Sequence, residues 1–125
     1  MTTYALAHLH NVTMGPQIVA YLEGIDATMA PFGGKFVIHG DGNKRVLEGS
    51  FAGDVIMLSF PTRKDAEGWY TSEAYRAILP LRTLNSVGDV LLIDGVDADH
   101  KATDILKKEP APRSTAIGEG KPINS

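Results

Sequence analysis

Hydrophobic positions along the chain change between a helical and a strand-like spacing, and this change predicts the order of secondary structure. Ile18, Leu22, Ile25 and Met29 recur at helical spacing after Pro16, a residue that a helix accepts at its first position. Apolar runs bounded by glycine, proline or polar residues predict strands at residues 4–10, 35–39, 54–60 and 87–96. Residues 45–49 are predicted to be a further short strand or a continuation of the second strand.

Two helices are predicted between the third and fourth of the longer strands. Thr62 offers an N-cap for a helix that continues to about Tyr70. Ser72 offers a second N-cap, for a helix that runs towards Leu84. Pro80 lies beyond the first turn of this second helix, so we expect it to kink or break the helix.

The resulting order is strand, helix, strand, strand, helix, strand, which is typical of an α+β, ferredoxin-like βαββαβ domain. In this arrangement an antiparallel sheet has both helical segments on one face. Residues 55–58 and 90–93 are continuously apolar, although a sheet with one wet face normally alternates apolar and polar residues. We therefore expect the second face to be covered as well, by a second subunit in a symmetric homodimer.

The composition changes near the C-terminus. Residues 1–96 form the predicted domain, and residues 97–125 are a tail rich in proline, glycine and small polar residues. Within the tail, residues 99–108 have the pattern of a short helix, and an extended arm is expected after it. Such an arm would lie along its own or a partner subunit, or would be ordered only by contacts between molecules in a crystal.

Composition and charge narrow the classes of function. The chain has 125 residues, no cysteine and a formal net charge of −3, which disfavours a nucleic-acid partner and thiolate chemistry. An RNA-binding sheet is disfavoured too, because no strand has the aromatic pattern of such domains. No apolar run approaches the roughly 20 residues of a membrane span, and no signal peptide is visible. A soluble, cytoplasmic protein without membrane partners is expected.

The histidines provide a weak indication of metal chemistry. His8 and His10 are two residues apart on a predicted strand, so their rings face the same side. No third ligand is spaced to join them, and a metal site is therefore not predicted. Both histidines are kept as candidate substrate-binding residues. His39 and His100 are interpreted as surface or hydrogen-bonded histidines.

Aromatic and cationic side chains are concentrated in the second helical region, which contains the only tryptophan. Trp69 fits either core packing or a ligand site, whereas Tyr70 and Tyr75 carry hydroxyls that need partners if they are buried. Arg82 follows Tyr75 by about two helical turns, and a cation beside tyrosines suits a carboxylate or an enolate. Glu48 is interpreted as a base with a raised pKa or as an ion-pair partner of an arginine such as Arg82.

Several short motifs together resemble those of one known family. They are Phe32-Gly33-Gly34-Lys35, Leu47-Glu48-Gly49, Ser59-Phe60-Pro61, Ala66 with Trp69-Tyr70, Ser72 and Tyr75, then Arg82, and finally Asp94-Gly95. In order and spacing these motifs resemble the DUF1330 family, which belongs to the dimeric α/β-barrel superfamily of ferredoxin-like domains. The resemblance covers about residues 3–96 and excludes the tail.

The resemblance implies a homodimer whose sheets form a barrel, but it supplies no reaction, because the family is named for its unknown function. Related dimeric barrels include cofactor-independent monooxygenases, lactone isomerases and haem-dependent enzymes, whose pockets lie between the sheet and the helices. No histidine occupies the helix where a haem ligand would be expected, so no cofactor is predicted.

Two hypotheses about function follow. In the first, the protein binds a small carboxylate or phenolic compound and is a cofactor-independent enzyme of monooxygenase or isomerase type. Catalytic residues would be Glu48, Arg82 and Tyr75, with Glu48 or a histidine as base and Arg82 with a tyrosine stabilising an oxyanion. Substrate-binding residues would be Tyr70, Trp69, His8 and His10. In the second, the chain is a non-catalytic binding or structural module in which the same residues stabilise a homodimer.

Overall fold

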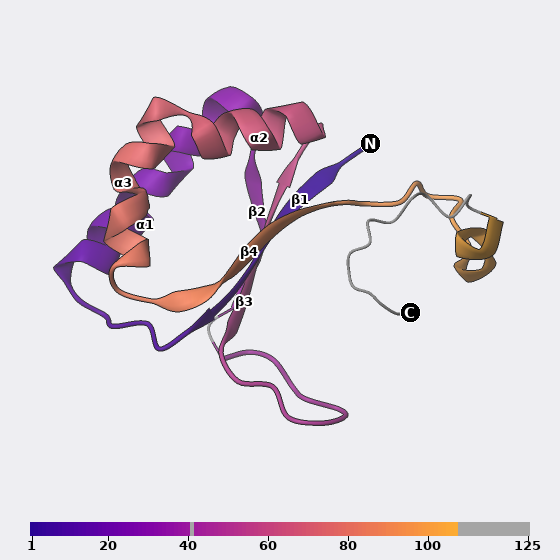
Figure 1. Cartoon of the computed structure of the whole chain (residues 1–125), viewed down its shortest axis with the longest axis horizontal. Coiled ribbons are helices and arrows are strands. Elements are labelled where there is room, and N and C mark those ends of the chain that lie inside the picture. The colour runs from indigo at the N-terminus through magenta and orange to yellow at the C-terminus, as the bar shows by residue number, and fades with distance from the viewer. Residues whose placement is uncertain (41, 108–125) are drawn as a thin grey trace, which may run out of the picture.

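The computed structural model describes residues 1–40 and 42–107, and in it one antiparallel sheet carries the α-helices on a single face (Figure 1). The strands are β1 (Thr3–His10), β2 (Lys35–His39), β3 (Asp54–Phe60) and β4 (Val87–Asp94). The α-helices are α1 (Pro16–Met29), α2 (Arg63–Thr71) and α3 (Glu73–Thr83), and the 3₁₀ helices are η1 (Ala30–Phe32) and η2 (Ala102–Lys107). The strand order is β2-β3-β1-β4 with antiparallel neighbours, so the ferredoxin-like α+β fold is confirmed.

The helix boundaries follow the caps that the sequence offers. The Thr62 hydroxyl accepts a hydrogen bond from the backbone N–H of Asp65 at 3.0 Å, at the start of α2. The Ser72 hydroxyl accepts one from the N–H of Tyr75 at 3.2 Å, and the extended backbone of Ser72 separates α2 from α3. The break that we expected at Pro80 does not occur, because α3 packs along α1 and continues to Thr83. Pro80 costs the helix one N–H donor without ending it.

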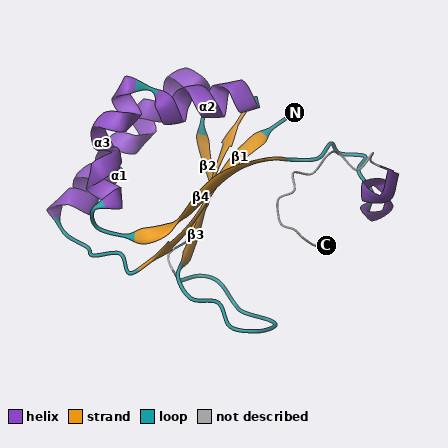
Figure 2. Cartoon of the chain, in the orientation of Figure 1, coloured by secondary structure: helices purple, strands orange, loops and turns teal. Residues whose placement is uncertain are grey.

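Other boundaries differ from the sequence pattern. Residues 45–49 belong to the loop between β2 and β3 instead of forming a strand, and β4 ends at Asp94 rather than at residue 96 (Figure 2). Beyond β4 the chain leads away from the sheet to η2, a shorter helix than expected (Figure 1). The extended arm that we expected after it lies outside the described residues. Among the described residues, no single helix is both long enough and apolar enough to cross a membrane.

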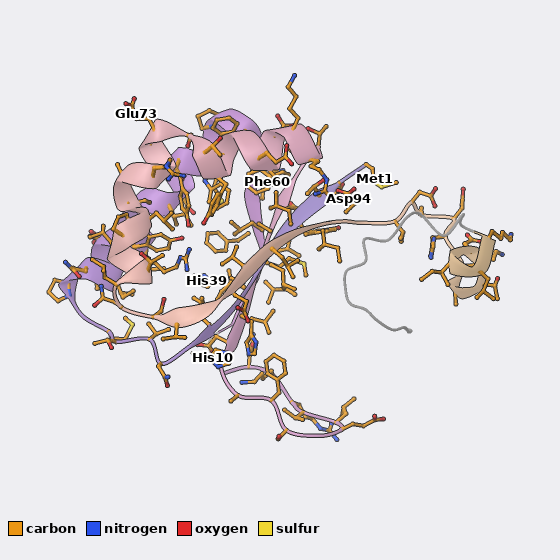
Figure 3. All side chains as sticks on the ribbon, viewed as in Figure 1. Met1, His10, His39, Phe60, Glu73 and Asp94 are labelled. Carbon is orange, nitrogen blue, oxygen red and sulfur yellow. The ribbon has the colours of Figure 1, made fainter. Side chains whose placement is uncertain are left out.

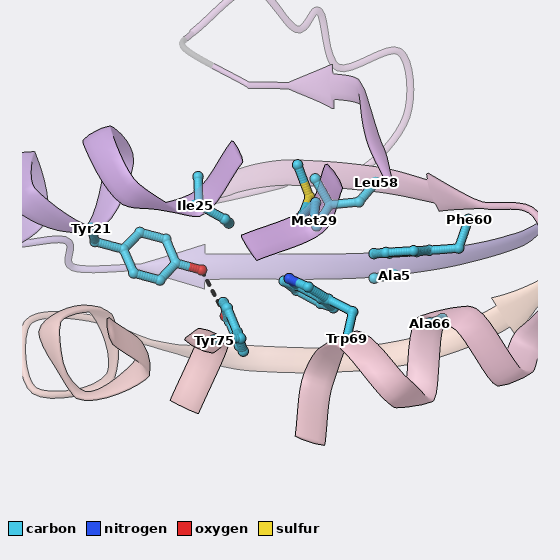
Figure 4. Close-up of a cluster of buried hydrophobic side chains, with 9 residues drawn as sticks. All are labelled: Ala5, Tyr21, Ile25, Met29, Leu58, Phe60, Ala66, Trp69 and Tyr75. Carbon is cyan, nitrogen blue, oxygen red and sulfur yellow. Dashed lines mark hydrogen bonds between the residues drawn. The ribbon is translucent and has the colours of Figure 1, made fainter. Parts of the chain in front are cut away.

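The core lies between the sheet and the helices, and aromatic side chains dominate it (Figure 4). Trp69 is 2% exposed and packs against the rings of Phe60 and Tyr75, with centroid distances of 5.2 and 4.1 Å. Its indole N–H donates a hydrogen bond to the Thr28 hydroxyl at 3.0 Å, and that hydroxyl donates to the carbonyl of Ile25 at 2.6 Å. Trp69 is therefore a core residue whose polar atom is satisfied by α1.

The other face of the sheet has an apolar centre, and the described part of the chain leaves this face uncovered (Figure 1). Strand alternation places Leu6, Met57 and Leu91 there, since Leu6 pairs with both of the other two. Leu91 is 47% exposed and Ile93 is 51% exposed, although both lie in the middle or final part of a paired strand. The absence of polar side chains at these positions agrees with the continuous apolar runs in the sequence.

The hydrogen bond from Trp69 provides a test of the core. In Thr28→Val the buried indole N–H loses its acceptor at nearly constant side-chain volume, so we expect the free energy of unfolding to fall by about 1–3 kcal/mol. Thr71→Val is the matched control, because Thr71 is exposed and its hydroxyl also donates to a helix carbonyl, at 2.9 Å from Glu67. Urea denaturation measures both variants, and an equal loss in the two would contradict the assignment.

Candidate functional site

A cavity of about 180 Å³ lies between the sheet and the helices. Most of its wall is aliphatic or aromatic, with side chains from β1, β3 and α1. The polar side chains that line it are few: Tyr21, His39, Asp54, Tyr75, Arg82 and Ser86. A largely apolar cavity with a few converging polar groups is the usual form of a small-molecule site.

Two tyrosines from different helices form the polar part of the helix wall. Tyr21 belongs to α1 and Tyr75 to α3, and their hydroxyl oxygens are 2.7 Å apart (Figure 4). Both side chains are buried, at 8% and 1% exposed. One hydroxyl proton is used between the two oxygens, so the proton of the accepting hydroxyl remains able to donate to a ligand oxygen.

Arg82 brings a positive charge to the same wall. Its guanidinium carbon lies 5.8 Å from the centroid of the Tyr21 ring, in cation–π range, and the side chain is half-buried. Burial lowers the pKa of Arg82 and is the largest single influence, but Tyr75 and Tyr21 together outweigh burial and raise it. In residues 1–40 and 42–107 no carboxylate forms an ion pair with Arg82. The helix side of the cavity therefore carries a cation that forms no ion pair with any described carboxylate.

Tyr21 stays protonated over the whole neutral range. Burial raises the pKa of Tyr21 far above its ordinary value of 10.0, and the neighbouring Tyr75 raises it further, whereas Arg82 lowers it. The hydroxyl pair is thus a neutral hydrogen-bonding group beside a cation. Together these side chains can bind an anionic oxygen, or stabilise negative charge that develops on one.

The structure brings together three of the residues that the sequence singled out. Tyr75, Arg82 and Trp69 all line the cavity. Tyr70 does not, since it faces a separate shallow groove formed with Thr71 and β4. Glu48 is exposed in the loop between β2 and β3, which extends from the end of the sheet away from the helices (Figure 1). It lines neither the cavity nor the groove, and the structure does not place it beside Arg82.

His8 and His10 lie on the outer face of the sheet, because the alternate residues Ala5, Ala7 and Leu9 of β1 line the cavity. The two rings are 4.2 Å apart between centroids, and Nε2 of His8 lies 2.6 Å from the carbonyl oxygen of Ala52. In Figure 3, His10 lies beside the β2–β3 loop, whereas His39 lies between the sheet and the helices. No group of three or more metal-binding side chains occurs in the part of the chain that the structure describes.

Four of the polar cavity residues were not selected from the sequence as site residues: Tyr21, His39, Asp54 and Ser86. Tyr21 had a visible signal, since it lies three residues after Ile18 and four before Ile25, on the apolar stripe of α1. Asp54 lies two residues before Ile56 and four before Leu58, so it faces the same side of β3 as these two inward-facing residues. His39 was interpreted as a surface or hydrogen-bonded histidine, and its inward orientation depends on a pairing irregularity that the sequence pattern does not reveal.

The chain belongs to the DUF1330 family, a domain of unknown function, whose model matches residues 2–96. This agrees with the resemblance carried by the short motifs, and it leaves the C-terminal tail outside the family domain. No curated protein matches the chain.

Solved structures share the fold at low sequence identity. A protein of unknown function from Rhodopseudomonas palustris is 15% identical with a TM-score of 0.58, over 77% of this chain and 83% of that one. A dimeric ferredoxin-like protein of unknown function from Thermobifida fusca is 14% identical with a TM-score of 0.51, over 74% and 88%. An antibiotic biosynthesis monooxygenase is 14% identical with a TM-score of 0.51, over 78% and 100%. At these identities the similarity establishes the fold alone.

The raised pKa of Tyr21 predicts a pH dependence of stability. Because the folded-state pKa lies above the unfolded value, the contribution of Tyr21 is complete below about pH 10 and is lost as the pH rises towards the folded-state pKa. Between about pH 9 and pH 11, the free energy of unfolding of the native protein should fall more steeply than that of Tyr21→Phe. The difference between the two slopes of free energy against pH approaches about 1.4 kcal/mol per pH unit near pH 11.

Urea denaturation at successive pH values measures this difference. Tyr4→Phe is the control, because it removes one phenol from the chain without touching the hydroxyl pair of Tyr21 and Tyr75. Parallel pH profiles for the native protein and Tyr21→Phe would contradict the assigned burial of the Tyr21 hydroxyl.

Proposed function

We propose that this protein binds a small, largely apolar anion, a carboxylate or a phenolic compound, in the cavity between its sheet and its helices. The observation that carries the proposal is Arg82, which has no ion-pair partner among the described residues. It lies beside the hydroxyl pair of Tyr21 and Tyr75, in a cavity whose remaining wall is mostly apolar. A desolvated cation gains most from a ligand that supplies the missing charge and accepts hydrogen bonds from the same wall.

The size of the cavity supports a ligand of one ring or similar bulk. An apolar cavity of about 150 Å³ in another protein holds benzene. The cavity here, at about 180 Å³, has room for such a group and for a short polar substituent. Trp69 and Tyr75 offer aromatic surface to the body of the ligand, and Arg82 faces its anionic end.

The same arrangement is compatible with catalysis without a cofactor. Arg82 and a tyrosine hydroxyl would stabilise negative charge that appears on a substrate oxygen during reaction. The fold is shared with an antibiotic biosynthesis monooxygenase, which supports an enzyme of monooxygenase or isomerase type only at the level of architecture. One observation favours a non-catalytic module instead: the hydroxyls of Tyr21 and Tyr75 hydrogen-bond to each other and so join two helices.

We also propose that the chain forms a homodimer through the outer face of its sheet. The apolar side chains on this face, including Leu91 and Ile93, are too exposed for a stable isolated surface. Similar folds are described as dimeric ferredoxin-like proteins, which supports the same assembly here. A C₂ dimer needs only one self-complementary patch of this kind.

Ligand binding is tested with benzoate and 4-hydroxybenzoate as probes. We expect both to raise the melting temperature of the native protein, and Arg82→Gln to weaken binding roughly 10- to 100-fold, because a charged hydrogen bond is lost. Arg76→Gln is the matched control, since Arg76 is exposed on the same helix and does not line the cavity. Titration calorimetry measures the affinities.

Two results would count against binding at this site. Failure of either probe, and of related aromatic acids and phenols, to shift the melting temperature would remove the proposed ligand class. Equal affinities for the native protein and Arg82→Gln would move any binding away from the cavity.

The proposed homodimer is tested by measuring the molecular mass of the protein in solution. Leu91→Asp places a charge on the outer sheet face, and we expect light scattering to show a monomer where the native protein is a dimer at micromolar concentration. Val19→Asp is the control, because Val19 is exposed to a similar degree, 44% against 47%, but lies on α1. A monomeric native protein, or a dimer retained in Leu91→Asp, would contradict the proposed interface.

A further inference from the structure

The sheet contributes its own titratable groups to the cavity. Among the described residues that line it, His39 is the only histidine and Asp54 the only carboxylate. They belong to β2 and β3, whereas Tyr21, Tyr75 and Arg82 belong to α1 and α3. A ligand in the cavity would therefore lie between the helix wall, which carries Arg82 and the tyrosine hydroxyls, and the sheet wall, which carries an imidazole and a carboxylate.

A pairing irregularity turns His39 into the cavity. Phe36 pairs with Leu58 and His39 pairs with Ile56, and all four of these side chains line the cavity. Residues three apart on a regular strand face opposite sides, so both can face inward only because the register shifts between Phe36 and Ile38. Bulges of this kind often re-aim a side chain beside an active site.

The surroundings of His39 hold its ring at the edge of the cavity. The ring stacks on Phe36, with centroids 4.6 Å apart and planes at 21°. The next residue, Gly40, lies so close to β3 that a Cβ atom there would be 2.7 Å from the carbonyl oxygen of Val55. One face of the imidazole is thus packed, while the side chain as a whole remains exposed, so it can exchange protons with solvent.

Asp54 is the inward-facing residue next to His39 on the neighbouring strand. His39 pairs with Ile56, and Asp54 lies two residues before Ile56 on the same face of β3. Such diagonal neighbours are about 7–8 Å apart at their Cα atoms, within electrostatic reach of each other. Asp54 is therefore placed to interact with a positive charge that forms on the His39 ring during a reaction.

We propose that His39 is the general base of this cavity and that Asp54 is a positioning residue that stabilises the resulting imidazolium. The inference rests on the proposed function, because it requires Arg82 and the tyrosine hydroxyls to bind the substrate oxygen. The substrate class is a small, largely apolar carbonyl compound with an acidic C–H next to its carbonyl group. Imidazole suits this role because it takes up and releases protons near neutral pH.

The step needs no oxidant or other co-reactant. A ring nitrogen of His39 takes the proton from the carbon next to the carbonyl. The electron pair of that C–H bond forms the carbon–carbon double bond, and a carbonyl electron pair moves to oxygen. Arg82 and a tyrosine hydroxyl stabilise the enolate oxygen. The imidazolium then returns the proton to carbon, which regenerates the substrate, or to oxygen, which releases the enol.

Proton transfer is tested by isotope exchange with phenylpyruvate, which has an aromatic ring, a carboxylate and an acidic CH₂ group. The full-length native protein in D₂O should speed deuterium incorporation into that CH₂ group over buffer alone, as followed by proton NMR. His39→Gln and His39→Asn should lower the exchange rate at least about 100-fold, the usual contribution of a general base. Their affinity for phenylpyruvate should change less than about threefold, since the anion-binding wall is intact.

Two further variants complete the comparison. Asp54→Asn should keep the affinity and lower the exchange rate about tenfold, since it removes one nearby charge. His100→Gln is the control, because His100 lies beyond β4 and does not line the cavity, and its exchange rate should match that of the native protein.

The outcomes separate this inference from the proposed function. Binding of phenylpyruvate without exchange above buffer overturns the role of His39 and leaves anion binding standing. Native exchange rates in both His39 variants, each shown to be folded by circular dichroism, overturn it as well. Absence of binding by the native protein overturns the proposed function and the inference together. Loss of exchange with retained affinity in the His39 variants supports the assignment.

Discussion

The hydrogen bond between the hydroxyls of Tyr21 and Tyr75 is the interaction on which the candidate site depends. It joins α1 to α3 above the sheet, at a place where two bulky phenols would otherwise leave buried polar atoms without partners. The same two residues border the cavity and raise the pKa of Arg82. Helix packing, cavity shape and the electrostatics of the helix wall are therefore coupled, and a change in one affects the other two.

The cavity is lined by hydrogen-bond donors on one side and by proton-accepting side chains on the other. Its helix wall offers a cation and neutral hydroxyls, while its sheet wall offers His39 and Asp54 on an apolar floor. Such a division suits a substrate whose oxygen gains negative charge as a neighbouring atom loses a proton, because each change meets a group suited to it.

Much of the architecture could be predicted from the sequence. Helical and strand spacing, together with caps at Thr62 and Ser72, were sufficient for the element order and for the break between α2 and α3. Pro80 does not break α3, because packing of α3 on α1 outweighs one lost hydrogen bond. In the site, Tyr75 and Arg82 could be selected because helical spacing places them near one face. Glu48 could not be judged in this way, since spacing does not tell where a loop extends.

The sequence by itself determined the βαββαβ order, the apolar centre of both sheet faces and the aromatic centre of the core, because these depend on local periodicity and composition. Only the tertiary structure decided which polar side chains share the cavity. The inward orientation of His39 requires a register shift between two strands, and the partnership of Tyr21 with Tyr75 joins residues 54 positions apart. Both arise from how separate elements pack together, and no pattern within a single element carries that information.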